Sequence, residues 1–329
     1  MPSTIELGFA LSSEEHAPGD LVRQAVRAEE SGFGFAAISD HYHPWVRAQG
    51  HSPFVWGVLG AIAEATDRLR VGTGVTCPTM RIHPAIIAQA AATAACLMPG
   101  RFFLGVGSGE ALNEHVLGHR WPPAEVRLEM LEEAVAVIRL LWRGGSQDHH
   151  GTHYTVENAT VFDLPDVLPE IVLAGGGPKA AALAGRIGDG FWSTSPDADL
   201  VGTFDGEGGS GKARYGQLTV CWAPDPAEAR KTALELWPNA GLGGQLSQDL
   251  PTPSHFEDAT APLTEDDVAG KVVCGPDVAA HVDLVRSYAD AGFTHLYFHQ
   301  VGRDQEGFLR FWETELRPAL VDQGLGGGA

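Results

Sequence analysis

Short apolar runs alternate with longer amphipathic segments along almost the whole chain, and this alternation constrains the fold more than any other sequence feature. The runs have the composition of buried strands, and the segments between them carry apolar residues at helical spacing. The predicted strands are residues 5–11, 35–41, 69–75, 102–107, 171–174, 190–194, 217–222 and 294–299. The main predicted helices are residues 20–31, 84–98, 125–142, 179–187, 277–291 and 305–320. Strands and helices that alternate in this way form a parallel sheet.

Eight predicted strands favour a closed (β/α)8 barrel over an open doubly wound sheet. In the open sheet a glycine-rich turn follows the first strand, but residues 10–14 contain no glycine. Barrels of about this length are commonly one domain, so we expect a single barrel domain over residues 1–329. We also expect an inserted hairpin at 153–163, an insertion at about 239–262 where periodicity is lost, and a flexible tail at 324–329.

The charge balance excludes several classes of protein. The chain has 22 Lys and Arg against 42 Asp and Glu, a net charge of −20, and no basic cluster. A nucleic-acid-binding protein needs a basic face, so we expect no nucleic-acid partner. No apolar stretch is long enough to span a membrane, and the N-terminus does not resemble a secretory signal. Four widely separated cysteines are typical of free thiols, and we expect a cytoplasmic protein.

Polar and glycine residues follow most of the predicted strands. In a (β/α)8 barrel these strand ends meet at one rim, which is where such barrels place their active sites. The strand-end residues are Glu14, Asp40-His41, Gly74-Val75, Ser108-Gly109-Glu110, Gly175-Gly176-Gly177, Ser193-Thr194-Ser195 and His299. Carboxylates, imidazoles and exposed backbone on one rim predict a site there.

The segment Ser39-Asp40-His41-Tyr42-His43-Pro44-Trp45 is the most informative of these strand ends. Histidine exchanges protons near neutral pH, and tryptophan offers a flat face to a planar ring. This combination suggests proton transfer beside an aromatic cofactor. His41 and His43 could also ligate zinc, but no further ligands stand at a recognisable spacing, so we expect no metal.

Glu110 and Glu114 form a second titratable pair, one helical turn apart at a predicted helix start. Acidic residues at a helix start commonly do no more than stabilise its positive dipole end. The functional alternative is a general acid or base whose pKa is set by burial. Both interpretations are open from the sequence.

Three further motifs, together with the Ser39–Trp45 segment, make the chain resemble a known family. They are Gly-Thr-Gly-Val-Thr-Cys-Pro-Thr at 72–79, Leu-Gly-Val-Gly-Ser-Gly-Glu-Ala-Leu-Asn-Glu at 104–114 and Ala-Gly-Gly-Gly-Pro at 174–178. The chain resembles the F420-dependent glucose-6-phosphate dehydrogenases of the luciferase-like (bacterial luciferase) superfamily. The resemblance covers nearly the whole chain. It implies a TIM-like barrel, commonly a homodimer, that binds the deazaflavin coenzyme F420 in its C-terminal mouth and transfers hydride to or from a small-molecule alcohol or sugar.

The resemblance also implies roles for individual residues. His41 and Glu110 become the catalytic proton-transfer pair, Trp45 flanks the ring and the substrate, and Glu14 lies in the same pocket. The implied cofactor contacts are Asp40, Gly74, Val75, Cys77, Asn113, Gly176 and Gly177, with a non-prolyl cis peptide at Gly74-Val75. The implied substrate contacts are Trp45, Thr194 and Lys271. Which of His41 and Glu110 acts as the base toward substrate stays open.

The chain departs from the resembled enzymes where they hold the sugar phosphate with three cations. One of these positions is Asp197, a second falls in residues 244–248, which contain no cation, and the third is Lys271. Because phosphate recognition relies on several charge-assisted hydrogen bonds, we expect a sugar or secondary alcohol that need not be phosphorylated. The alternatives are an F420H2-dependent reductase, an FMN-dependent luciferase-like monooxygenase and a non-catalytic deazaflavin-binding protein.

Overall fold

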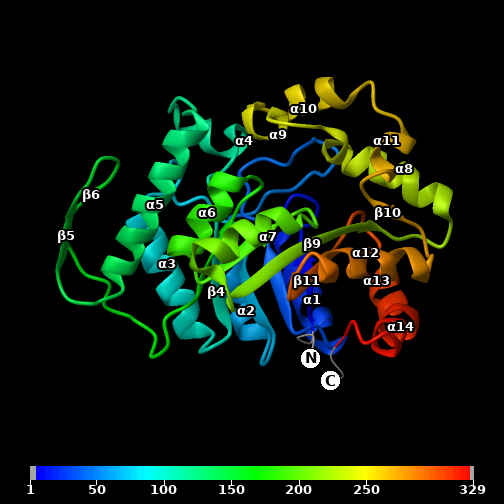
Figure 1. Ribbon diagram of the computed structural model, residues 1–329, viewed down its shortest axis with the longest axis horizontal. Helices are drawn as coiled ribbons and strands as arrows, with labels where there is room; N and C mark the ends of the chain where they lie inside the picture. Colours follow the sequence, from blue (N-terminus) through cyan, green and yellow to red (C-terminus); the bar gives the residue numbers. More distant parts are fainter. Residues whose placement is uncertain (1–4, 327–329) are drawn as a thin grey trace.

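The chain folds into a closed parallel barrel surrounded by helices, as the alternation predicts (Figure 1). The computed structural model describes residues 5–326. Within these residues the barrel strands are β1 (Glu6–Leu11), β2 (Phe35–Ile38), β3 (Arg70–Thr73), β4 (Phe102–Val106), β7 (Ile171–Ala174), β8 (Gly190–Ser193), β9 (Ala213–Cys221) and β11 (His295–Gln300). Each strand pairs in parallel with its neighbour, and the β8–β9 pairing closes the ring. The predicted (β/α)8 barrel is confirmed.

Helices that follow the strands form the outer layer. They are α1 (Pro18–Glu30), α2 (Val55–Ala65), α3 (Pro84–Leu97), α5 (Ala124–Leu141), α6 (Pro178–Ile187), α7 (Ala198–Phe204), α8 (Pro226–Leu236), α12 (Val278–Asp290), α13 (Gln305–Phe311) and α14 (Arg317–Asp322). Shorter helical turns are α4 (Ala111–Glu114), η1 (His115–Leu117), η2 (Asp205–Gly209) and η4 (Trp312–Leu316). Proline in the first turn begins α1, α3, α6 and α8, since its fixed φ suits a helix start and its missing N–H has no partner there.

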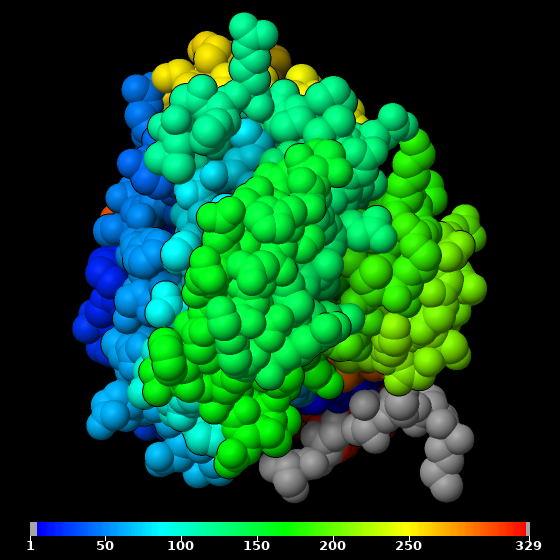
Figure 2. All heavy atoms as spheres, turned by 90° about the vertical axis from the view of Figure 1, so that its left-hand side faces the viewer, coloured from blue at the N-terminus to red at the C-terminus, as the bar shows by residue number. Residues whose placement is uncertain are grey.

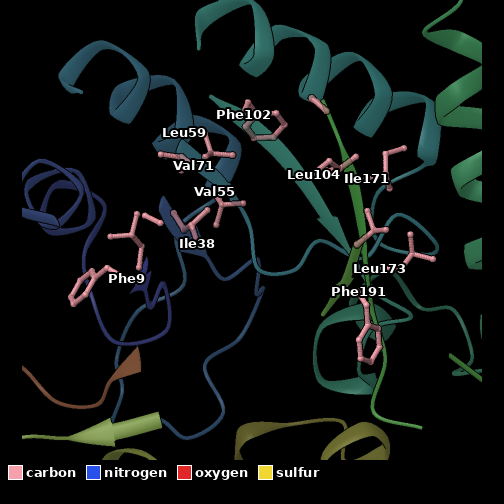
Figure 3. Packing of buried hydrophobic residues seen from close by; sticks show 14 of the residues in the cluster. Phe9, Ile38, Val55, Leu59, Val71, Phe102, Leu104, Ile171, Leu173 and Phe191 are labelled. Atoms are coloured by element: carbon pink, nitrogen blue, oxygen red, sulfur yellow. The ribbon is translucent and has the colours of Figure 1, made fainter. Parts of the chain in front are cut away.

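The main hydrophobic core lies between the barrel and this helical layer (Figure 3). The outward-facing residues of the strands, among them Phe9, Val71 and Leu104, are fully buried against apolar faces of the helices, such as Leu59 of α2. Burial of each such side chain contributes about 1.5–3 kcal/mol by transfer from water. The outer layer therefore holds the strands, and with them the strand ends that form the rim.

Aromatic rings fill the inside of the barrel below the rim. Phe35, Phe103, Trp192, Tyr215 and Tyr297 are almost fully buried and form one cluster. The Trp192 and Tyr215 rings are stacked with centroids 5.0 Å apart and planes 10° from parallel. These rings close the interior from below, so a ligand can lie only above them, at the carboxyl ends of the strands.

A hairpin outside the barrel joins α5 to β7. It consists of β5 (Gln147–His150) and β6 (Thr155–Ala159), which pair antiparallel. The hairpin was predicted, but at 153–163, and it begins earlier because residues 147–150 have no apolar residue to indicate a strand. Glu133 of α5 accepts backbone hydrogen bonds from residues 152, 153 and 154. The hairpin and the segment after it cover the centre of the face shown in Figure 2 (green).

The segment between α8 and α12 lies over the barrel mouth, at the top of Figure 1. It contains η3 (Pro238–Gly241), α9 (Leu246–Asp249), α10 (Pro253–Thr260), α11 (Glu265–Ala269) and β10 (Val273–Cys274), which adds to the edge of β9. The predicted insertion at 239–262 falls within it. These helices are too short to show periodicity, but α10 and α11 have side-chain caps, and in α10 the Thr252 hydroxyl accepts the His255 N–H.

The last described residues contact the body of the protein. The Leu325 N–H donates to the Leu320 carbonyl at 2.9 Å, and Leu325 packs against the core. Residues 327–329 of the predicted flexible tail lie outside the described residues. Among residues 5–326, no helix combines the length and apolar character that a membrane crossing requires.

Candidate active site

A cavity of about 890 Å³ opens at the carboxyl ends of the barrel strands. It is lined by the predicted site residues Glu14, Asp40, His41, Trp45, Gly74, Val75, Cys77, Glu110, Gly176, Gly177, Thr194 and Lys271. Its volume is at the upper end of what small-molecule and cofactor sites occupy. The barrel thus brings together residues that are far apart in the sequence. Among the catalytic, cofactor and substrate residues that the resemblance implies, Asn113 does not line the cavity, and neither does the strand-end residue Ser195.

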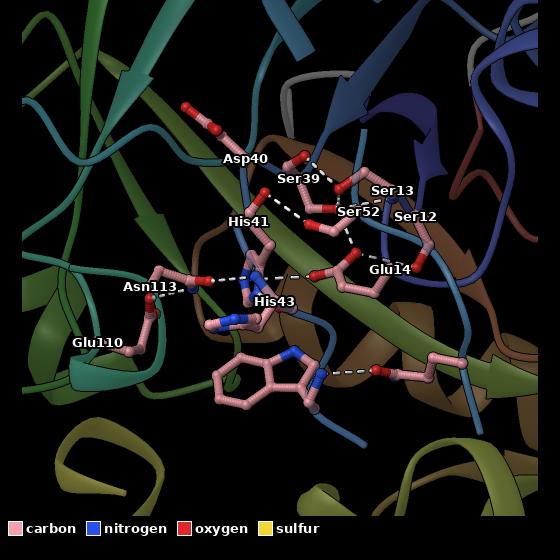
Figure 4. Close-up of polar contacts among 12 residues, drawn as sticks. Ser12, Ser13, Glu14, Ser39, Asp40, His41, His43, Ser52, Glu110 and Asn113 are labelled. Carbon is pink, nitrogen blue, oxygen red and sulfur yellow. Dashed lines mark hydrogen bonds and ion pairs between the residues drawn. The ribbon is translucent and has the colours of Figure 1, made fainter. Parts of the chain in front are cut away.

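His41 and Glu14 form a largely buried pair in the lining of this cavity (Figure 4). His41 Nε2 lies 3.3 Å from Glu14 Oε1. Glu14 Oε2 accepts hydrogen bonds from the Ser39 hydroxyl at 2.5 Å and the Ser12 hydroxyl at 3.2 Å. Burial acts to raise the pKa of Glu14, but the His41 charge and the Ser39 hydrogen bond outweigh it and lower that pKa below its ordinary value. Glu14 is therefore held as a carboxylate.

Two acceptors orient the His41 ring. His41 Nδ1 lies 3.2 Å from the His43 carbonyl oxygen, while Nε2 lies 3.3 Å from the Glu14 carboxylate. Whichever ring nitrogen carries a proton therefore faces a group that can accept its hydrogen bond. The imidazole is thus held in a fixed orientation in the lining of the cavity.

Trp45 stands next to His41 and is held by three contacts. Its ring centroid is 5.0 Å from His41 and 5.1 Å from Phe256 of α10. Its backbone N–H donates to Gln49 Oε1 at 2.7 Å, and Gln49 Nε2 donates to the Leu236 carbonyl. Trp45 thus presents a fixed flat wall between the imidazole and the segment over the mouth.

Asn113 lies behind the cavity wall and orients the segment that carries His41. Its Oδ1 accepts the backbone N–H groups of Tyr42 at 2.9 Å and His43 at 3.2 Å. His43 Nδ1 in turn lies 3.0 Å from the Leu112 carbonyl.

Within residues 5–326 no group of three or more His, Cys, Asp or Glu side chains is arranged to hold a metal ion.

Asp40 belongs to a buried network that includes Arg81, a residue the sequence reasoning missed. Asp40 accepts hydrogen bonds from Arg81 at 2.8 Å and from the Thr76 hydroxyl at 2.5 Å. The Arg81 backbone N–H also donates to Glu114 at 2.8 Å. Burial is the main cause that raises the pKa of Glu114 to about 7, and it raises the pKa of the Cys77 thiol as well. Glu114, one of the two acids in the predicted pair, thus titrates near neutral pH.

Glycines form the opposite wall. The Gly74–Val75 peptide bond is cis, as the resemblance implied. A side chain on Gly109 would reach within 2.6 Å of Cys77 Sγ, so only glycine leaves that wall open. Gly176 and Gly177 precede α6, and a Cβ at either would meet no atom within 4 Å. They therefore border open space at a helix start, where backbone N–H groups favour an anion.

The charged residues around the cavity differ from the sequence expectation. Lys271 lines it, but Asp197 caps α7 by accepting the Asp199 and Leu200 N–H groups and does not line it. The acid at one of the three phosphate positions is thus absent from the lining. Two unforeseen cations, Arg127 and Lys179, line the cavity from α5 and α6. Arg127 donates to Gln248 of α9, while its buried Nε finds no partner among the described residues.

Several other lining residues carried no local signal in the sequence. Trp192, Gln217, Trp237 and Tyr297 line the cavity from barrel strands and from the segment that follows α8. The side chains of Trp192, Gln217 and Tyr297 point inward because strand residues alternate between the two faces, and short apolar runs do not reveal which face is which. His299, in contrast, was recognised as a strand-end residue and does line the cavity.

The fold and this site define a class of protein. A sequence model of the luciferase-like monooxygenase family matches residues 3–295, so the chain belongs to that family. F420-dependent glucose-6-phosphate dehydrogenase from Mycobacterium avium (strain 104) is 38% identical over 330 residues, which cover 96% of this chain and 98% of the relative. The enzyme of the same name from Mycobacterium tuberculosis (strain ATCC 25618 / H37Rv) is 36% identical with the same coverage.

Solved structures give the same likeness. An F420-dependent secondary alcohol dehydrogenase in complex with an F420-acetone adduct has a TM-score of 0.89 and 28% identity, and covers 96% of this chain and 99% of that one. The coenzyme F420-dependent tetrahydromethanopterin reductase from Methanopyrus kandleri has a TM-score of 0.77 at 20% identity, with 96% of this chain and 99% of that chain covered. The second likeness concerns the fold alone.

Proposed function

We propose that this protein is an F420-dependent dehydrogenase that oxidises a sugar or secondary alcohol. The observation that carries the proposal is the His41–Glu14 pair, in which a carboxylate orients an imidazole beside Trp45 in a cavity large enough for a cofactor and a substrate. The relatives named F420-dependent glucose-6-phosphate dehydrogenase and the solved F420-dependent secondary alcohol dehydrogenase support it.

The cavity suits the coenzyme on two counts. When bound, F420 supplies the acceptor for the hydride. Gly74, Val75 and Cys77 line the cavity with small side chains that leave room for a planar ring, and Asp40 lines the cavity as well. The open space at Gly176 and Gly177 suits the anionic tail of such a coenzyme, and Arg127, whose buried Nε has no partner among the described residues, also lines the cavity. Lys179 lines it as well, but Lys179 is paired with Glu125.

His41 and Glu110 transfer the protons, and the Glu14 carboxylate, 3.3 Å from His41 Nε2, orients the imidazole. Oxidation of an alcohol carbon requires that its hydroxyl proton leave as the hydride leaves. A second protein group supplies a proton, or stabilises the charge, at the ring that accepts the hydride. Asn113 contacts both parts of this catalytic pair. Its Oδ1 accepts a hydrogen bond from the segment that carries His41, and its Nδ2 lies 3.5 Å from Glu110 Oε2. Trp45, Thr194 and Lys271 contact the substrate.

The substrate need not be phosphorylated. Lys271 is the one cation retained from the three phosphate positions, and residues 244–248 supply only neutral side chains, Gln245, Ser247 and Gln248, to the cavity. A single lysine is a weak site for a phosphate dianion. We expect unphosphorylated sugars or secondary alcohols to reduce F420 faster than glucose 6-phosphate does.

Titration and turnover test the proposal. F420 should bind and change its visible absorbance while FMN does not, and an alcohol and sugar panel should bleach the bound F420. His41→Ala and Glu110→Gln should each lower turnover by roughly 10²-fold or more with F420 binding retained. The pH–rate profiles of the two variants show which of His41 and Glu110 must be unprotonated for alcohol oxidation. Preferential binding of FMN, or wild-type rates in both variants, would contradict the proposal.

We further propose that the chain acts as a cytoplasmic homodimer of single barrel domains, 1–329. The resemblance supports the dimer. Among the described residues, Cys77, Cys96, Cys221 and Cys274 are all free thiols, which supports a reducing compartment. Sedimentation equilibrium at micromolar concentration tests the dimer, and a monomer would exclude it.

A further inference from the structure

A line of hydrogen bonds runs across the inside of the barrel and ends in the active-site cavity. The Trp192 indole can only donate, and it donates to the Tyr297 hydroxyl at 3.1 Å. Tyr297 therefore donates its own proton to Gln217 Oε1 at 2.6 Å. The opposite orientation of the amide would leave the Tyr297 proton without an acceptor among the described residues. The oxygen and the nitrogen of the Gln217 amide are thus assigned.

The Gln217 amide in turn fixes the hydroxyl group of Thr219. Gln217 Nε2 lies 3.1 Å from Thr219 Oγ1 and 3.4 Å from His299 Nδ1. An amide nitrogen donates and does not accept, so both of these atoms are acceptors. The hydrogen of the Thr219 hydroxyl is left over, and within residues 5–326 no group accepts it. Because Thr219 lines the active-site cavity, this hydrogen is available to a ligand there.

Thr219 lies across the cavity from the catalytic residues of the proposed function. It is on β9, in register with His299 of β11. β11 and β1 separate β9 from β2, which His41 follows, and β8 and β7 separate β9 from β4, which Glu110 follows. In a closed ring of eight strands, three steps in either direction lead toward the opposite side. A substrate oxygen that meets Thr219 is therefore a different atom from the oxygen that loses its proton to His41 or Glu110.

Other uncharged polar groups and a flat apolar ring line the same cavity. Asn239 Oδ1 is buried and has no hydrogen-bond partner among the described residues. Ser247 adds a neutral hydroxyl to the lining. The Trp237 ring lies with its centroid 4.3 Å from that of His299, beside the strand that pairs with β9. A lining of neutral donors and acceptors with an aromatic wall suits a ligand that carries several hydroxyl groups.

We propose that Thr219 donates a hydrogen bond to a second oxygen of the substrate, so that the protein oxidises a polyhydroxylated alcohol, such as an unphosphorylated sugar, in preference to a monoalcohol. This inference rests on the proposed function. A site that is built to bond a particular substrate oxygen rejects an analogue without it, because the polar group of the protein is then left unpaired. Thr219 would thus select the substrate at a distance from the reacting carbon.

The test compares two variants of Thr219. Thr219→Val keeps the shape of the side chain but has no hydroxyl, and Thr219→Ser keeps the hydroxyl. Thr203→Val is the matched control, because Thr203 lies on α7 outside the lining and its hydroxyl donates to the Asp199 carbonyl. Thr219→Val should lower the ratio of kcat/KM for glucose to kcat/KM for 2-propanol by roughly 3- to 10-fold. Thr219→Ser and Thr203→Val should keep the wild-type ratio, whereas a mere disturbance of Gln217 would slow both substrates alike.

An unchanged ratio in Thr219→Val would overturn the inference, and so would wild-type turnover of 2-propanol without turnover of glucose, sorbitol or glycerol. If Thr219→Val does not fold, Thr219→Ala decides the same question. Absence of F420 turnover with all four compounds would instead count against the proposed function. Titration of the tryptophan fluorescence with glucose would then decide the role of Thr219. The wild type should bind glucose roughly 3- to 10-fold more tightly than Thr219→Val, and equal or absent binding would overturn that role.

Discussion

Replacing Glu114 with glutamine should flatten the pH dependence of stability between about pH 4.5 and 7. Burial raises the pKa of Glu114 from 4.5 to about 7 in the folded protein. A carboxyl group whose pKa is raised on folding stabilises the protein below its unfolded pKa, and this contribution is lost as the pH rises through the folded pKa. The difference of about 2.5 pH units, at 1.36 kcal/mol per unit, corresponds to about 3 kcal/mol.

The test compares the free energy of urea unfolding at pH 4.5 and pH 8 for the wild type and Glu114→Gln. The variant carries no ionisable group at this position, so its stability relative to the wild type should improve by about 3 kcal/mol over that interval. Glu157→Gln, on the exposed side of β6, is the control and should show no such change. A constant difference between Glu114→Gln and the wild type at both pH values would refute the reasoning.

Two further predictions concern the segment over the mouth and the helix after β8. Phe256→Ala removes a fully buried ring that packs on Trp45, so it should cost about 3–5 kcal/mol in urea unfolding; it should also raise KM for the alcohol, and an unchanged KM would contradict the positioning of Trp45. Asp197→Ala removes the cap of α7 and should lower the free energy of unfolding by about 1 kcal/mol. Asp197 does not line the cavity, so the variant should use glucose 6-phosphate no better than the wild type does. Improved use would contradict the assignment of Asp197 as a cap.

The barrel could be predicted because its strands are apolar runs whose pattern is local. The same reasoning failed where a strand lacks an apolar run. β9 begins at Ala213 rather than at 217, since Ala213-Arg214-Tyr215-Gly216 does not read as a buried strand. Most of the site could be located because (β/α)8 barrels place their active sites at the carboxyl ends of the strands, and the sequence shows where most strands end.

The ion pairs and hydrogen bonds between residues far apart in the sequence could not be predicted. Arg81 joins Asp40 and Glu114 from a loop with no recognisable motif, and nothing local indicates that its guanidinium is buried. Asp197 shows the converse error. It occupies the position of a phosphate-binding cation by resemblance, but its carboxylate caps the helix that it begins. A residue's position in a motif indicates which part of the fold it lies in. The direction in which its side chain points depends on the local backbone geometry.

The aromatic rings that fill the barrel have a kinetic consequence. Phe103, Trp192, Tyr215 and Tyr297 close the site from below, so ligands enter and leave from the rim. A molecule that occupies the deeper part must arrive before one that lies above it and must depart after it. A cavity closed from below therefore imposes an order of binding and release on any two ligands that lie one above the other.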